Sequence, residues 1–218
     1  MHRARQHAER NTRERRHRLA REAARLMAEG GVRDYHQAKL KAAERLGMRD
    51  DASLPRNREI EDALREYQRL FLGEAHATGL RRRREAALRA LEFFAAFDAR
   101  LVGPVLEGTA DAHSPVALQL YADDPDAVAR FLEDAGIPAE SGSRRLRLDR
   151  KREGTFPVWL FSAEDLGFDV TVLPAGALRQ APLSGVDEKP MRRASAAQLL
   201  QLLAEDEVAG YEASAGSR

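Results

Sequence analysis

The chain has 218 residues, of which 43% are hydrophobic and 6% aromatic, enough for one moderate core with a smaller helical unit beside it. It holds no cysteine, which excludes disulfides, thiolate metal sites and a cysteine nucleophile and indicates a reducing compartment. Because no stretch approaches ~20 apolar residues and the arginine-rich start lacks an apolar signal segment, the sequence predicts a cytoplasmic protein without a membrane partner.

The net charge of +1 conceals two halves of opposite sign. Residues 1–100 carry 24 Lys and Arg against 16 Asp and Glu, whereas residues 101–218 carry 12 against 19. A basic half can meet a polyanion, and two oppositely charged halves can also attract each other within one molecule. Composition leaves both interpretations open.

The first hundred residues are predicted to be helical. Asn11 and Glu14 have the spacing of a capping box for a helix over residues 12–29, and the glycine pair that follows is expected to end it. Asp34 is expected to cap a second helix that ends before Gly47.

Two further helices complete this region. After a polar connector over residues 48–55, apolar side chains recur at three- and four-residue spacing from Ile60 to Phe71, which is the clearest helical pattern in the chain. Gly73 is expected to end that helix, and a fourth helix is predicted over residues 80–97.

From residue 101 the pattern changes to short apolar runs separated by Gly, Pro, Ser and Asp, which predicts strands. The runs lie at residues 101–106, 116–121, 146–148, 158–161 and 169–173. Between the second and third runs, Asp124 and Pro125 are typical of a helix start, and Gly136 of its end. Ser195 is expected to cap a last helix that reaches Glu205.

The predicted fold class is α+β, with an N-terminal helical region, a mixed β-sheet with a covering helix, and a C-terminal helix. By residues, we expect a basic helical region at 1–98, an α/β core at 99–182, a helix packed on that core at 183–209, and a flexible tail at 210–218.

One segment of the core, residues 103–120, carries a motif. It reads Gly-Pro-Val-Leu-Glu-Gly-Thr-Ala-Asp-Ala-His-Ser-Pro-Val-Ala-Leu-Gln-Leu and resembles the signature of the minimal nucleotidyltransferases, within the polymerase beta-like superfamily. In that family a strand ends in Gly-Ser, a Gly-Thr turn follows, and a Ser-Asp-x-Asp-Leu strand supplies two carboxylates to Mg²⁺. The positions that match are Gly103, Gly108, Thr109, Ser114 and Leu118. Over residues 95–175 the resemblance implies the nucleotidyltransferase fold, with the first four of these residues binding a nucleotide.

The chain departs from this signature where the chemistry lies. Carboxylates at positions i and i+2 of a strand share a face and hold the metals that bridge nucleotide phosphates, but this chain has Pro115 and Ala117 there. Pro104 replaces the serine of the family and has no backbone N–H for a phosphate, and Glu107 stands where an arginine is common. Asp169 matches the third carboxylate, on a neighbouring strand.

These departures predict a nucleotidyltransferase-like protein with a degenerate site, which acts by binding a nucleotide, a nucleic acid or a protein partner. The resemblance makes Asp169 the candidate catalytic residue and a candidate metal ligand, with Mg²⁺ as the cofactor if the protein is an enzyme. Asp111, in the loop before the strand, is a second candidate metal ligand by its chemistry and place alone.

Two alternatives stay open. An active metal-dependent transferase or hydrolase would use a shifted carboxylate set, drawn from Asp111, Asp123, Asp124 and Asp169. A helical nucleic-acid-binding protein would contact phosphates through its arginine run, which comprises Arg81, Arg82, Arg83 and Arg84. Each set also has a structural interpretation, because aspartates shape turns and cap helices, and arginine runs form solvated helix faces.

Overall fold

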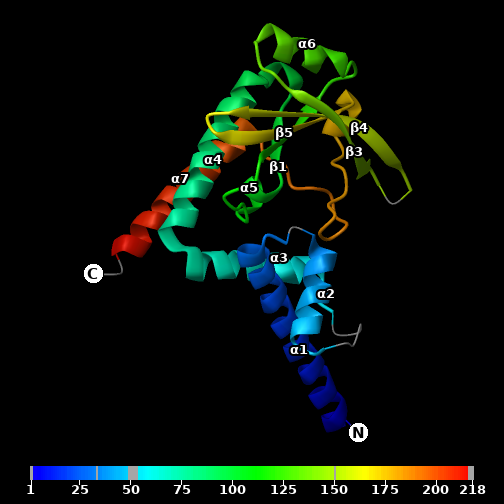
Figure 1. The fold of residues 1–218 in the computed structure, drawn as a ribbon, viewed down its shortest axis with the longest axis vertical. Coiled ribbons are helices and arrows are strands. Elements are labelled where there is room, and N and C mark those ends of the chain that lie inside the picture. The colour runs from blue at the N-terminus through cyan, green and yellow to red at the C-terminus, as the bar shows by residue number, and fades with distance from the viewer. Residues whose placement is uncertain (1, 33, 49–53, 150, 216–218) are drawn as a thin grey trace. The chain divides into compact units, whose positions relative to one another are not determined.

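The chain folds into two units, which a computed structural model describes over residues 2–32, 34–48, 54–149 and 151–215 (Figure 1). The helical unit consists of residues 1–77 with 185–187, and the sheet unit consists of residues 78–184 with 188–218. No helix within the described ranges is long and apolar enough to cross a membrane.

The helical unit is built from consecutive helices. These are α1 (His2–Gly30), α2 (Tyr35–Arg45), α3 (Asn57–Tyr67), the π-helical turn η2 (Gln68–Leu72) and the start of α4 (Gly73–Phe93). Asp34 caps α2 as predicted, because its carboxylate accepts a 2.8 Å hydrogen bond from the Gln37 N–H. The predicted connector over residues 48–55 includes 49–53, which lie outside the described residues.

The predicted start of the first helix is wrong. α1 begins at His2, so Asn11 and Glu14 lie within the helix and not at its end. The segment before Asn11 is composed of good helix formers, mainly Arg, Ala, Gln and Glu, and holds no Gly or Pro that would stop the helix. An ion pair of 3.0 Å between Arg10 and Glu14, at i and i+4, further favours the helical turn there.

The boundaries of the fourth helix also differ from the prediction. Gly73 ends the π-helical turn, with φ of 50°, but α4 begins at once and not at residue 80. It ends at Phe93, and residues Ala95–Phe97 (η3) form a 3₁₀ turn. A glycine at positive φ therefore changes the chain direction here without leaving a loop.

Five strands form one mixed sheet in the sheet unit. In spatial order they are β1 (Arg100–Val102), β2 (Val116–Tyr121), β5 (Leu166–Leu173), β4 (Glu153–Ala163) and β3 (Glu140–Arg147). β2 and β5 are parallel, and the other neighbouring pairs are antiparallel. The helices beside them are α5 (Pro104–Glu107), α6 (Asp126–Asp134), the 3₁₀ turn η4 (Ala175–Leu178) and α7 (Ala196–Ala215). This architecture confirms the predicted α+β class.

Four of the five predicted strands are wrong in extent, since β4 begins five residues before the expected 158–161 and β5 begins three residues before the expected 169–173. The strand expected over residues 101–106 ends at Val102, because Gly103 turns the chain with φ of 73° and Pro104 starts the short helix α5. Proline is favoured in the first helical turn and has no N–H for a strand ladder. The strand expected over residues 146–148 is the end of the longer β3, whose first residues are polar and lack an apolar run.

The last helix begins as predicted and ends later. Ser195 and Gln198 cap α7 reciprocally, since the Ser195 N–H donates to the Gln198 side chain at 2.9 Å and the Gln198 N–H donates to Ser195 Oγ at 3.4 Å. α7 continues past Glu205 to Ala215, so the first part of the expected tail is helical, while residues 216–218 lie outside the described residues.

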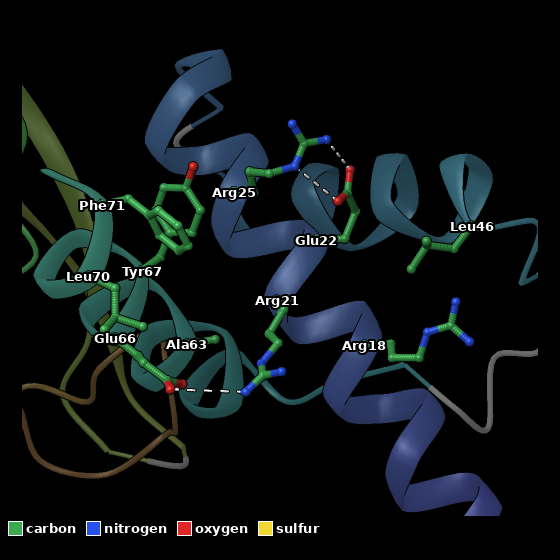
Figure 2. A pocket seen from close by; sticks show the side chains of 10 residues that line it. All are labelled: Arg18, Arg21, Glu22, Arg25, Leu46, Ala63, Glu66, Tyr67, Leu70 and Phe71. Carbon is green, nitrogen blue, oxygen red and sulfur yellow. Dashed lines mark hydrogen bonds and ion pairs between the residues drawn. The ribbon is translucent and has the colours of Figure 1, made fainter.

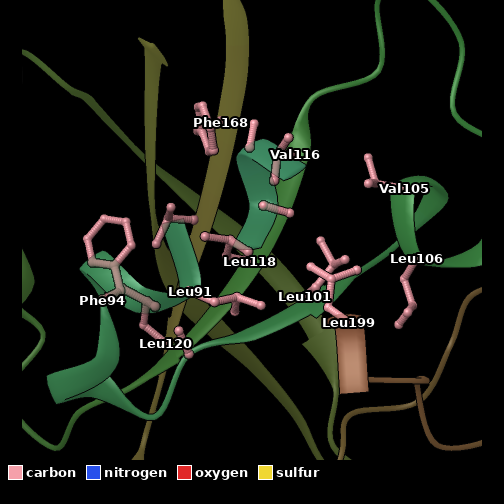
Figure 3. Packing of buried hydrophobic residues seen from close by; sticks show 14 of the residues in the cluster. Leu91, Phe94, Leu101, Val105, Leu106, Val116, Leu118, Leu120, Phe168 and Leu199 are labelled. Carbon is pink, nitrogen blue, oxygen red and sulfur yellow. The ribbon is translucent and has the colours of Figure 1, made fainter. Parts of the chain in front are cut away.

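One face of the sheet is apolar and covered by helices (Figure 3). Leu118 of β2 belongs to one buried cluster with Leu91 of α4, Phe94 directly after it, Leu132 of α6 and Leu199 of α7. Because side chains alternate along a strand, the residues of β2 and β5 that alternate with the members of this cluster point to the opposite face. That opposite face holds the candidate site.

Candidate functional site

The candidate site lies on the polar face of the sheet, which we define by Ala117 and Gln119 of β2 and Asp169 and Thr171 of β5. The parallel register sets Ala117 beside Asp169 and Gln119 beside Thr171. Two of the three positions that the resemblance links to metal binding, Ala117 and Asp169, are therefore neighbours, and only Asp169 carries a carboxylate.

Asp169 is held by an arginine that reaches across β4 from β3. Arg144 donates from Nη1 to Oδ1 at 2.9 Å and from Nη2 to Oδ2 at 2.7 Å, and its Nη1 also donates to Thr171 Oγ1 at 3.0 Å. The Asp169 side chain is 14% exposed, and that of Arg144 is 40% exposed. Both carboxylate oxygens are thus engaged by one guanidinium, in the bidentate geometry that makes such pairs strong.

A glycine turn lies against the same part of β2. Gly103 has φ of 73°, and a Cβ added there would lie 3.6 Å from the Cβ of Ala117. Gly108, with φ of 80°, ends α5, and the buried Thr109 donates its N–H to the Pro104 carbonyl at 2.9 Å. Both glycines therefore occupy backbone conformations that L side chains rarely adopt.

Asp111 and Ser114 form a local turn before β2. The Ser114 hydroxyl donates to Asp111 Oδ1 at 2.7 Å, and Ser114 Oγ accepts from the Asp111 N–H at 2.9 Å. Asp111 Oδ1 also accepts from the His113 N–H at 2.8 Å. This mutual bonding supports the turn-forming interpretation of Asp111.

The other carboxylates of the shifted set have partners of their own. Asp123 accepts from the Ala175 N–H at 3.0 Å, and Asp124 accepts from the Asp126 N–H at 3.0 Å and from Arg130 at 2.7 Å. The hydrogen bond from Arg130, followed by that from the Asp126 N–H, lowers the pKa of Asp124. Within the described ranges, no three His, Asp or Glu side chains gather to hold a metal ion.

The arginine run on α4 divides into buried and exposed members. Arg84 donates to the carbonyls of Val105 at 3.1 Å and Leu106 at 3.3 Å and forms an ion pair with Asp206. These bonds fix the end of α5, next to the glycine turn, and Arg84 itself is buried.

Arg83 has a similar role on the loop between α5 and β2. It is buried and donates to the carbonyls of Ala112 and Ser114. Arg81 pairs with Glu85 at 2.9 Å and Arg82 donates to the Glu164 carbonyl at 2.7 Å, and both are exposed. The phosphate contact of this run stays a prediction, and its exposed members are Arg81 and Arg82.

Several residues of the polar face have no motif in the sequence. Arg193 donates to the Tyr121 hydroxyl at 2.7 Å and to the carbonyls of Ala177 and Leu178 at 3.1 Å, and the Tyr121 hydroxyl donates to Gln119 Oε1 at 3.0 Å. Burial raises the pKa of the Tyr121 phenol. This network holds the segment that follows β5 in place.

Arg144 was the main omission of the sequence prediction. Arg144 lies on the polar strand β3, which pairs with β4, and β4 pairs with the strand that carries Asp169. Only this pairing identifies Arg144 as a partner of Asp169. Glu107 is likewise paired, with Arg192 at 3.0 Å, so the reversed charge at this position has a partner within the sheet unit.

A hollow of ≈ 620 Å³ adjoins the polar face. Its lining includes Pro115, Glu140, Leu160, Ser162 and Gly167. Pro115 occupies the first carboxylate position of the family motif, and the register of β4 and β5 sets Leu160 opposite Asp169. Of the motif segment only Pro115 lines the hollow, and none of Gly103, Gly108, Thr109 and Ser114 does. Comparisons with protein-family models, with curated proteins and with solved structures found no match.

Proposed function

We propose that the protein is a nucleotidyltransferase-like protein that binds a nucleotide without transferring it. The order of elements around the motif supports this proposal, since helix α4, strand β1, the Gly-Thr turn after α5, strand β2 and helix α6 are followed by further strands that end with β5, which carries Asp169. The observation that carries the proposal is the bidentate pair between Asp169 and Arg144.

This pair opposes metal-dependent transfer. Nucleotidyl transfer of this kind needs carboxylates that hold Mg²⁺ against the phosphates. A metal ion at Asp169 would have to displace the Arg144 guanidinium, and the side chains of Pro115 and Ala117 would offer it no further ligand. The negative charge of Asp169 is thus balanced by the Arg144 guanidinium and not by a metal ion.

The same arginine favours binding of a phosphate group. A guanidinium has five N–H donors, of which Arg144 uses three on Asp169 and Thr171, and its side chain is 40% exposed, so the remaining donors can meet a phosphate oxygen. The neighbouring hollow is within the range of about 300–1,000 Å³ that small-molecule sites occupy. We therefore expect the phosphates near Arg144 and the nucleoside in the hollow.

Titration of a fluorescent ATP analogue with the full chain tests this proposal. We expect saturable binding of similar strength in Mg²⁺ and in EDTA, because no metal bridges the phosphates. Arg144→Gln is expected to weaken binding about tenfold, the size of one lost charge-assisted contact. Arg145→Gln is the matched control, because Arg145 is the next residue of β3, points away from the polar face and is 80% exposed.

Other results would overturn the proposal. Mg²⁺-dependent incorporation of labelled nucleotide that Asp169→Asn abolishes, or saturable Mg²⁺ binding by calorimetry, would establish the active enzyme instead. Salt-dependent binding of an oligonucleotide that is lost in an Arg81→Gln/Arg82→Gln variant, with no binding of the ATP analogue, would favour the nucleic-acid-binding alternative.

A further inference from the structure

The helical unit carries a groove that has no part in the proposed function. Residues of α1, α3 and η2, together with the residue that follows α2, enclose ≈ 430 Å³ (Figure 2). Its apolar lining consists of Leu46, Ala63, Tyr67, Leu70 and Phe71. A volume of this size accepts several side chains of a partner.

The groove exposes large apolar side chains. Phe71 is 68% exposed and Leu70 is 56% exposed, and the rings of Tyr67 and Phe71 lie with their centroids 4.7 Å apart. These residues lie in or next to the π-helical turn η2, a local irregularity that is frequent at functional sites. Adjoining apolar residues of this size on a surface indicate a binding surface.

The rim of the groove is basic. Arg18 and Arg21 project from α1, one turn apart, and both are exposed. Arg21 reaches Glu66 only at 4.0 Å, and within the described ranges no acidic group pairs with Arg18.

The rest of the helical unit around the groove is also positively charged. Glu22, the second acidic residue of the lining, is already bound by Arg25 at 2.8 Å and by Arg45 at 3.5 Å. Residues 1–77 as a whole carry 18 Lys and Arg against 13 Asp and Glu. A carboxylate that approaches Arg18 and Arg21 therefore meets a field of favourable sign.

We propose that this groove binds an acidic amphipathic helix of a partner protein. Apolar side chains at i, i+4 and i+7 of such a helix would enter the groove, and its flanking carboxylates would pair with Arg18 and Arg21. The aliphatic part of the lining opposes a nucleic acid as the occupant, since bases stack on aromatic rings and Leu46, Ala63 and Leu70 offer neither a ring nor a hydrogen bond.

A pair of synthetic peptides tests this proposal on the full chain. The first is a labelled helical peptide of about 18 residues, five turns, with leucines along one stripe and glutamates beside it. The second has lysine at every glutamate position. Fluorescence anisotropy should detect saturable binding of the glutamate peptide, at least about tenfold tighter than that of the lysine peptide, and the difference should shrink at high salt.

Variants then locate the site. Phe71→Ser should weaken the glutamate peptide about tenfold, the loss that an apolar anchor residue gives. Arg18→Glu with Arg21→Glu should reverse the preference in favour of the lysine peptide. The matched controls are Leu40→Ser and Arg13→Glu, because both residues are exposed and lie outside the groove lining. Far-ultraviolet circular dichroism checks that each variant is folded.

Three results would overturn the proposal. One is equal binding of the two peptides, or equal effects of the groove and control variants. Another is self-association of the chain that Phe71→Ser abolishes, which would assign the groove to a second copy. The third is binding of a single-stranded RNA that competes with the peptide and is lost in the same variants, which would assign it to a nucleic acid. None of these results bears on the ATP analogue, so this proposal and the proposed function fail independently.

Discussion

The helical unit and the sheet unit bury side chains of different size. Five of the seven buried residues in the main cluster of the helical unit are alanines, and the other two are Leu19 and Ile60. In the sheet unit only five of the twenty buried residues of the main cluster are alanines, and the remainder are Leu, Val and Phe. Because hydrophobic stabilisation follows the apolar area buried, the helical unit gains less from each buried residue.

This difference separates the tasks of the two units. Alanines let helices approach closely, but the unit then depends on a few large side chains, because surface ion pairs such as Arg25–Glu22 add little stability. Its large apolar residues Leu70 and Phe71 remain exposed in the groove. We expect the helical unit to unfold first and to be stabilised by whatever fills the groove.

The largest effect is expected in the core of the sheet unit. Leu118→Ala removes a fully buried side chain from the inner strand β2 and should cost about 3–5 kcal/mol of unfolding free energy. Trp159 is the one tryptophan of the sequence and lies in β4, so its fluorescence follows this unit. The control is Leu160→Ala, because Leu160 is 42% exposed and its truncation should cost much less. If the two variants lose equal amounts of unfolding free energy, the buried cluster is not what stabilises the sheet unit, and the comparison fails.

A smaller effect is expected in the helical unit. Ile60→Ala should cost about 2–4 kcal/mol and should leave the Trp159 transition unchanged, because Ile60 belongs to the separate alanine-rich cluster. Circular dichroism at the helix band reports this loss, and Leu40→Ala is the exposed control. If both probes shift together in Ile60→Ala, the units do not unfold separately and the comparison fails.

The sheet unit also depends on a buried polar side chain, that of Arg84, in addition to its large apolar core. Arg84→Met should cost about 2–3 kcal/mol, since the carbonyls of Val105 and Leu106 lose their donors in a buried place. Arg82→Met is the control, because Arg82 is exposed and makes one bond, to the Glu164 carbonyl. A variant as stable as the wild type would mean that water replaces the guanidinium at the end of α5.

How much of this the sequence could predict depends on how local each signal is. The buried strand β2 was predicted with its correct bounds, because a continuous apolar run between turn residues is a local pattern. β3 was missed over most of its length, because its sequence Glu-Ser-Gly-Ser-Arg-Arg shows no apolar alternation. Tertiary pairing with β4 makes it a strand, and no local pattern contains that information.

The sites follow the same rule. The motif located the glycine turn and Asp169, but the partner of Asp169 comes from a strand 25 residues away along the chain and reaches it across β4. The groove combines side chains of three helices, each of which has an ordinary periodicity by itself. The roles of Arg144 and Phe71 depend on neighbours that are distant along the chain, so the sequence alone does not predict them.

The smallest expected effect is that of a surface carboxylate, Asp124, and it depends on pH. Its pKa is lowered in the folded chain by Arg130 and by the Asp126 N–H, so it adds stability above the ordinary carboxyl pKa, and this contribution disappears as the pH falls through the lowered value. Asp124→Asn keeps an oxygen for the Asp126 N–H and removes the charge. The variant should therefore be slightly less stable than the wild type at neutral pH and equally stable in acid, as measured by Trp159 fluorescence. A difference that persists in acid would assign the effect to the lost shape of the helix start and not to its charge.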